Sequence, residues 1–178
     1  MSTIDLIVLG ILLNNPLNAY ELVRFIRERS VDRVLKISEP AVFKSCRRLA
    51  NSGYLDGETV REQGVPDKVV YRINDKGRER LYELMSHFAT NHKPFYIEFN
   101  TVIWNIENLE RDKAREILSR LQAQLHQLKL WIIEHEEEGR GKIPFGPAMI
   151  VRQYVMTLSA LCDWIDETVV EFDARSKT

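Results

Sequence analysis

The stretch SEPAVFKSCRRLANS, residues 38–52, decides the fold, because it predicts a short helix with one apolar and one basic face. At about 100° per residue, the apolar side chains form one stripe, which contains Val42, Cys46 and Leu49 with Phe43 and Ala50 at its edges. The opposite side carries Lys44, Arg47, Arg48 and Asn51, together with Pro40 and Ala41. One face can therefore pack against a core while the other meets a polar partner.

Three residues mark the start of this helix. Ser38 is expected to cap the first turn through its hydroxyl, Glu39 suits the positive end of the helix, and Pro40 is tolerated early, where backbone N–H groups have no helical partner. An ordinary surface helix can carry three cations as well. The helix alone therefore does not establish a function.

A β-hairpin is predicted directly after this helix. Gly53-Tyr54 ends the helix, residues 55–63 form the first arm, residues 64–67 form the turn and residues 68–73 form the second arm. The arms carry the cations Arg61, Lys68 and Arg72. A basic helix followed by such a hairpin has the order of a winged helix, whose helix enters the major groove while the wing follows the DNA backbone.

The flanking segments complete a first domain. Thr3–Leu13 is predicted as a buried helix, and Asn18 is expected to cap a second helix that supports residues 38–52 from behind. The run Val31–Ile37 is predicted to add a short edge strand to the hairpin. Asn74 is expected to cap a last helix. We place the domain boundary in the polar, proline-containing segment that follows it, so that the domains span residues 1–90 and 91–178.

The second half of the chain contains two long apolar helical seams that advance by alternating steps of four and three. The seam residues that we expect to support dimerisation are Leu118, Leu121, Leu125, Leu128, Ile132, Val151, Val155, Leu158 and Ile165. The polar break at residues 136–141 predicts that the two helices fold back as an antiparallel hairpin. Such long seams leave apolar surface, for which a second copy of the chain is the natural cover.

The composition is that of an ordinary water-soluble protein: 178 residues, of which 44% are hydrophobic and 29% are charged. No apolar run approaches the roughly 20 residues needed to cross a bilayer, so we expect a cytoplasmic protein without a membrane partner. The net charge is −1, but residues 1–90 carry 14 Lys and Arg against 12 Asp and Glu, a net +2, and the remainder is −3. An acidic partner would therefore meet the first half.

The sequence argues against an enzyme. It has no Gly-rich phosphate loop, no nucleophile elbow and no metal-ligand spacing, so we expect no catalytic residue, no metal and no cofactor. Cys46 and Cys162 lie on apolar stripes, which favours buried free thiols over a disulfide or a zinc site. Oxidation sensing by Cys46 is the alternative, and its apolar surroundings favour an inert thiol.

The chain resembles the PadR family of bacterial transcriptional regulators, in the AphA-like, virulence-activator branch with a long helical C-terminal domain. The resemblance covers nearly the whole chain and rests on residues 9–10, 12–13, 18–22, 41–49, 53–55 and, most specifically, 64–73 running into 76–78. It implies a mainly α fold with a small β-hairpin wing, composed of an N-terminal winged helix-turn-helix and a C-terminal helical domain. It also implies a homodimer on an inverted-repeat operator in duplex DNA, commonly as a repressor and sometimes as an activator.

The expected DNA contacts follow from the helix and the wing. Ala41, Lys44 and Ser45, on the early turns, are candidates for base edges, with Pro40 beside them, whereas Arg47, Arg48, Lys68 and Arg72 are candidate phosphate anchors and Arg61 lies on the wing. Tyr20 either reaches a phosphate or packs beside the helix. A winged helix that binds protein instead of DNA is the competing interpretation.

An effector pocket is a further hypothesis. Phe99, Trp104, Trp131 and Trp164 are candidates to line it, because flat apolar ligands stack on indoles and some PadR-like regulators respond to phenolic compounds. Core and dimer packing explains the same aromatic residues and is the interpretation that we prefer. If these residues do bind an effector, the protein could instead be a ligand-responsive activator, which is the alternative to a repressor.

Overall fold

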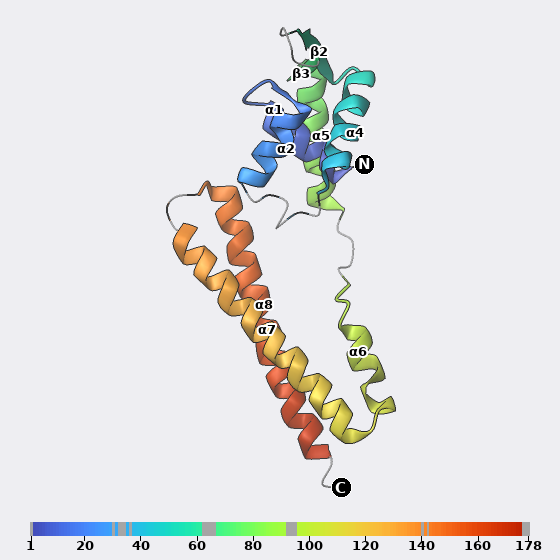
Figure 1. The fold of residues 1–178 in the computed structure, drawn as a ribbon, viewed down its shortest axis with the longest axis vertical. Helices are drawn as coiled ribbons and strands as arrows, with labels where there is room; N and C mark the ends of the chain where they lie inside the picture. Colours follow the sequence, from blue (N-terminus) through green and yellow to red (C-terminus); the bar gives the residue numbers. More distant parts are fainter. Residues whose placement is uncertain are drawn as a thin grey trace. The chain divides into compact units, whose positions relative to one another are not determined.

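The computed structural model describes residues 2–29, 31, 35, 37–61, 67–91, 96–139, 141 and 143–175. Its contacts divide the chain into two units, residues 1–94 and 95–178, each with its own hydrophobic core. The elements are, in order, α1 (Thr3–Leu12), β1 (Leu17–Asn18), α2 (Ala19–Glu28), α4 (Glu39–Asn51), β2 (Leu55–Val60), β3 (Lys68–Ile73), α5 (Asp75–Thr90), α6 (Asn100–Asn105), the 3-10 turn η1 (Ile106–Asn108), α7 (Arg111–Gly139) and α8 (Phe145–Ala174) (Figure 1). The predicted fold class is confirmed. None of the described helices is long and apolar enough to cross a membrane.

The sheet of the first unit is antiparallel and has the strand order β1-β3-β2. The hairpin pairs Leu55 with Ile73 at its base and Val60 with Lys68 at its far end, which confirms the predicted wing. The third strand is the short β1, in which Leu17 pairs with Tyr71 and Asn18 pairs with Val70.

The predicted third strand at Val31–Ile37 is therefore misplaced. Val31 is helical and Leu35 lies in a bend, while residues 32–34 and 36 lie outside the described part of the chain. Leu17 and Asn18 take the edge position instead, because they directly precede α2 and reach β3 in an extended conformation.

The sequence predicts polar N-caps for α2, α4 and α5, and two of these three caps behave as predicted. The Asn18 carboxamide oxygen accepts from the backbone N–H groups of Tyr20 and Glu21, and the Glu21 carboxylate accepts from the Asn18 N–H, which completes a capping box. Asn74 caps α5 by accepting from the Gly77 N–H at 3.0 Å. The prediction for Ser38 is wrong, because no side-chain cap from its hydroxyl is found among the described residues and its backbone carbonyl accepts from Ala41 and Val42.

The core of the first unit lies where α1, α2, α4 and α5 meet the sheet. Its fully buried side chains include Leu9, Leu22, Val42, Cys46 and Leu84, drawn from all four helices. Gly77 allows the closest approach, since a Cβ there would lie 2.2 Å from the Tyr54 carbonyl oxygen. This packing fixes α4 against α1 and α2 and leaves its other face outward.

The second unit is an antiparallel helical hairpin, as predicted, preceded by α6 and η1 (Figure 1). The start of α7 lies beside the end of α8: the Arg115 guanidinium binds the Asp173 carboxylate at 2.8 Å, and Gln122 donates to Asp166 at 2.8 Å. The buried seam residues are Leu118, Leu125, Leu158 and Ile165. The seam is less buried toward the connection between α7 and α8, where Leu128 is exposed.

Candidate DNA-binding interface

The outward face of α4 carries most of the candidate contacts. Lys44 and Arg47 are exposed one turn apart, Pro40 is exposed in the first turn and Ala41 is half-buried. The surface here is hollowed by about 380 Å³, lined by Glu39, Pro40, Phe43, Lys44 and Arg47. Two cations beside the early turns of a helix, whose N-terminal end is itself partly positive, favour an anionic partner.

Tyr20 lies at the edge of this face. Its ring meets that of Phe43 edge to face, with the centroids 4.9 Å apart, and the residue is still 72% exposed. The two interpretations of Tyr20 are thus compatible, because a ring that packs on α4 keeps its hydroxyl in solvent.

The cationic side chains of the wing differ in their exposure to solvent. Arg72 is exposed on β3 opposite Asp56, and Lys68 is half-buried. Arg61 forms an ion pair with Asp67, with Nε 3.4 Å from Oδ2, which partly neutralises it. Most of the predicted turn at residues 64–67 lies outside the described residues, which resume at Asp67.

Ser45 does not belong to the outward face, contrary to the expectation that it reads a base edge. It is 0% exposed, and its hydroxyl donates to the Asp5 carboxylate on α1. On the helical wheel Ser45 lies beside Leu49, on the apolar stripe, and this position was the signal that it packs inward.

Asp5 is the residue that the sequence interpretation missed. It is 9% exposed and accepts hydrogen bonds from Ser45 and from the guanidinium of Arg48, which it also holds as an ion pair. A second ion pair, between Arg27 and Glu39, joins α2 to the first turn of α4. Both pairs tie α4 to the helices behind it, and Arg48 is therefore not a simple phosphate anchor.

Cys46 lies on the buried face of α4. Burial raises the pKa of its thiol from 9.0 to about 12, so the reactive thiolate is scarce at neutral pH. This supports the interpretation of an inert packing residue. Within the described residues there is also no cluster of three or more potential metal ligands.

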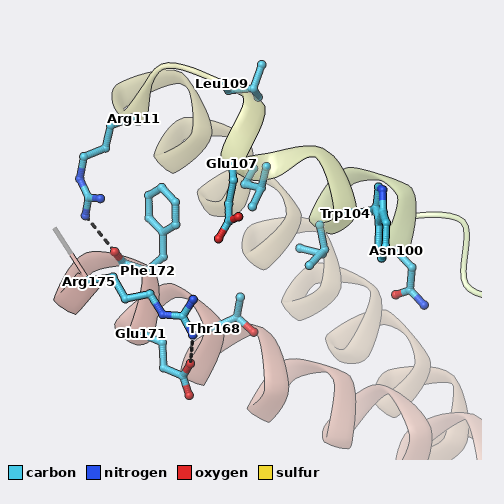
Figure 2. A pocket seen from close by; sticks show the side chains of 11 residues that line it. Asn100, Trp104, Glu107, Leu109, Arg111, Thr168, Glu171, Phe172 and Arg175 are labelled. Atoms are coloured by element: carbon cyan, nitrogen blue, oxygen red, sulfur yellow. Dashed lines mark hydrogen bonds and ion pairs between the residues drawn. The ribbon is translucent and has the colours of Figure 1, made fainter.

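The four candidate effector residues do not share one cavity. Phe99 and Trp164 stack at 5.7 Å, Trp131 is exposed on α7, and Trp104 is 87% exposed. A cavity of about 810 Å³ does lie between α6, η1 and the end of α8; Trp104 and Phe172 line it together with Glu107, Arg111 and Arg175 (Figure 2). Arg111 is engaged there, since it donates to the Phe172 carbonyl at 2.8 Å.

Comparisons with known proteins give one family match, within the first unit, and a shared fold over the whole chain. Residues 8–83 match the model of the transcriptional regulator PadR-like family, and no curated protein matches the sequence significantly. Among solved structures, PadR of Bacillus subtilis in complex with operator DNA has a TM-score of 0.78 at 15% identity, covering 97% of this chain and 98% of that one. The same protein in complex with p-coumaric acid gives the same TM-score and identity, with 97% and 99% coverage.

Two further regulators have the same fold over their full length. A PadR-like regulator of Bacillus cereus has a TM-score of 0.71 at 18% identity, and the virulence activator AphA of Vibrio cholerae has 0.73 at 17%, each covering 97% of this chain and 99% of the other. These likenesses span both units of the chain, whereas the family model spans the first unit.

Proposed function

We propose that this chain, whose residues 8–83 match the model of the transcriptional regulator PadR-like family, is a DNA-binding transcriptional regulator that acts in the cytoplasm as a homodimeric repressor on an inverted-repeat operator. Residues 1–90 would form the DNA-binding domain and residues 91–178 the dimerisation domain. The observation that carries the proposal is the pair of exposed cations, Lys44 and Arg47, one turn apart on the outward face of α4.

The proposed division of labour follows from position. Ala41 and Lys44 lie on the early turns of α4, the part of a recognition helix that reaches base edges, with Pro40 beside them. Arg47 and the wing residues Arg61, Lys68 and Arg72 contact phosphates, and the Tyr20 hydroxyl reaches the backbone from α2. Lys44 therefore influences sequence choice, whereas Arg72 supplies affinity for any duplex.

The homodimer is supported by apolar surface on the second unit. Large apolar side chains are exposed along α7, α8 and their junction, including Leu128, Leu130, Trp131, Phe145, Met149 and Met156. Monomeric proteins rarely expose so many large apolar side chains together. In a symmetric dimer, each copy would cover the apolar surface of the other. A dimer also makes the second half-site contact intramolecular, at an effective concentration of the order of millimolar.

The decisive experiment is a DNA titration at several salt concentrations. An operator is first selected from genomic fragments that the purified protein retains, and its affinity is compared with that of random duplex by fluorescence anisotropy. Each phosphate neutralised contributes about −0.9 to the log–log salt slope, so contacts from two subunits predict a steep slope. An affinity that is independent of salt would contradict the proposal.

Two substitutions separate the roles. Lys44→Ala is expected to weaken the operator more than random DNA, by about 1–3 kcal/mol if Lys44 reads a base, whereas Arg72→Ala weakens both similarly. Lys113→Ala, which removes an exposed cation on α7, is the matched control and leaves both affinities unchanged. For the alternative, a winged helix that binds protein, neutralising both Lys44 and Arg47 would leave binding of the protein partner largely intact, whereas it should abolish DNA binding.

A small aromatic effector is a second candidate, because PadR of Bacillus subtilis has been solved with p-coumaric acid and the cavity beside Trp104 has an aromatic wall. Such a ligand would stack on Trp104 or Phe172, and the protein would then be ligand-responsive. The test is quenching of tryptophan fluorescence by p-coumaric acid in the parent and in Trp104→Phe. Quenching that is identical in the two proteins would place the ligand elsewhere.

A further inference from the structure

The underside of α4 contains a polar cluster that the proposed DNA contacts do not use. The Asp5 carboxylate, from the first turn of α1, accepts from the Ser45 hydroxyl and from Nη2 of Arg48 through the same oxygen, Oδ1. Ser45 is fully buried, whereas the Arg48 side chain is 45% exposed. The cluster therefore extends from the buried Ser45, inside the core, to Arg48, whose side chain faces solvent.

The charge of Arg48 is compensated where it stands. Lys44 and Arg47, on the same helix, extend from α4 as exposed cations, but the guanidinium of Arg48 is held by a carboxylate that is itself largely buried. A buried carboxylate that lost its partner would be costly, so Asp5 retains Arg48 strongly. A phosphate that recruits Arg48 must compete with Asp5.

We propose that Asp5 is a specificity-determining residue that restrains Arg48 and thereby limits binding to non-operator DNA. This inference rests on the DNA-binding function proposed above. Non-specific complexes are held almost entirely by phosphate contacts, so each additional mobile cation strengthens them directly. In an operator complex base contacts fix the position of α4, and a released Arg48 has less freedom to choose a phosphate. Asp5 thus raises the ratio of operator to random-DNA affinity.

The test uses the charge-removing substitution Asp5→Asn in the full-length protein. One additional phosphate contact contributes about −0.9 to the salt slope, which at physiological salt corresponds to roughly fivefold in affinity. We therefore expect random-DNA affinity to rise about fivefold per subunit, with a steeper salt slope, while operator affinity rises less. An unchanged or lowered random-DNA affinity would overturn the proposal.

A double-mutant cycle shows whether the effect passes through Arg48. In the Arg48→Ala background, Asp5→Asn is expected to produce no rise in the salt slope, because the released cation is gone. If the slope steepens equally in that background, the effect does not depend on Arg48 and the inference is wrong.

Two matched variants separate restraint from packing and from general electrostatics. Ser45→Ala breaks the buried end of the cluster but leaves the Asp5–Arg48 ion pair, so random-DNA affinity should not rise. Glu83→Gln removes a negative charge in the same unit and frees Arg80, whose Nη1 lies 2.7 Å from Glu83, on α5. A rise as large as that of Asp5→Asn in either control would overturn the proposal.

The outcomes also distinguish this inference from the function on which it rests. Parent protein that shows no salt-dependent DNA binding refutes the proposed function, whereas normal parent binding with no gain in Asp5→Asn refutes only the restraint. Thermal unfolding of each variant is measured alongside. If Asp5→Asn does not fold, Asp5→Ser removes the same charge with a smaller side chain and is measured in its place.

Discussion

The two units of this chain solve the problem of burying apolar surface in different ways. The first unit has fifteen buried hydrophobic residues and six large hydrophobic residues exposed, whereas the second has eight buried and twelve exposed, counted over the described residues. The first unit packs four helices against a sheet, but the second has one helical hairpin with α6 and η1 beside it. A hairpin of two helices has too few neighbours to enclose both of its sides.

This difference indicates which unit covers its own apolar surface and which unit leaves much of it exposed. Several polar groups of the described first unit find their partners within it, through the capping box at Asn18, the cap at Asn74 and the Asp5 cluster. The second unit has cross-helix polar contacts, such as those of Asp166, but its apolar side chains extend beyond them. The first unit is therefore expected to depend on its own packing, and the second on what covers it.

The largest effect is expected from placing charge in the seam of the second unit. Leu121→Asp with Leu158→Asp introduces carboxylates without partners between α7 and α8, each costing several kcal/mol. All three tryptophans lie in this unit, so their fluorescence reports its unfolding, while hydrogen exchange follows residues 2–91. Sedimentation is expected to show a monomer or a partly unfolded chain, with operator affinity reduced by about two orders of magnitude.

The matched control is Gln124→Asp with Thr157→Asp, which places the same charges at exposed positions of the same helices. This pair should leave sedimentation and DNA binding unchanged. A folded monomer of the seam variant that binds the operator as tightly as the parent would break the contrast between the units.

The next effect is confined to the first unit. Gly77→Ala places a methyl group 2.2 Å from the Tyr54 carbonyl oxygen and 2.7 Å from the Ile73 side chain, and backbone cannot move aside cheaply. We expect a loss of about 3 kcal/mol, the upper part of the range for overpacking. The control Gly10→Ala, with nothing within 4 Å among the described atoms, should stabilise α1 by up to about 1 kcal/mol. Urea unfolding followed by circular dichroism measures both.

A smaller effect compares two helix starts of the first unit. Asn18→Ala removes a side-chain cap with two accepted hydrogen bonds and should cost about 1 kcal/mol. Ser38→Ala removes a hydroxyl that makes no cap among the described residues and should cost well under that amount. Equal losses in urea titrations would show that the Ser38 hydroxyl contributes in solution.

The smallest effect is a pH dependence in the second unit. Hydrogen bonds from Gln122 and then His126 lower the pKa of Asp166 below its usual 3.8. A lowered pKa in the folded state contributes stability above pH 3.8 that is lost as the pH falls through the folded value. The thermal midpoint reported by tryptophan fluorescence should therefore decline in this acidic range in the parent and decline less in Asp166→Asn. Equal declines would exclude a contribution from this carboxylate.

Local patterns predicted most of the fold because they depend on short-range physics. The two faces of residues 38–52, the alternation of the hairpin and the caps at Asn18 and Asn74 are all fixed within a few residues of sequence. The edge strand was misplaced because β1 has two residues, too few to show any alternation. Val31–Ile37 contains more β-branched residues than Leu17–Asn18. The edge position nevertheless goes to Leu17 and Asn18, because these two residues pair with Tyr71 and Val70 of β3.

The candidate site was less predictable because its key polar contact is long-range. Asp5 and Ser45 are forty positions apart, and neither segment alone indicates that they meet. One signal was present: Asp5 shares a helical face with Val8, Leu9 and Leu12, so an acid on a buried stripe required a partner. The partner itself, with Arg48, became apparent only from the packing of α1 on α4.

The double role of Asn18 limits where residues can be inserted into this protein or deleted from it. Asn18 is at once the last residue of β1, paired with Val70, and the N-cap of α2. No spacer separates the wing from the helix-turn-helix at this junction. A residue inserted between them either removes the cap from α2 or shifts the strand by one position and turns its side chains to the opposite face. Insertions and deletions should therefore be excluded here during evolution, and the spacing from Leu17 to the first turn of α2 should be a fixed length in any functional variant.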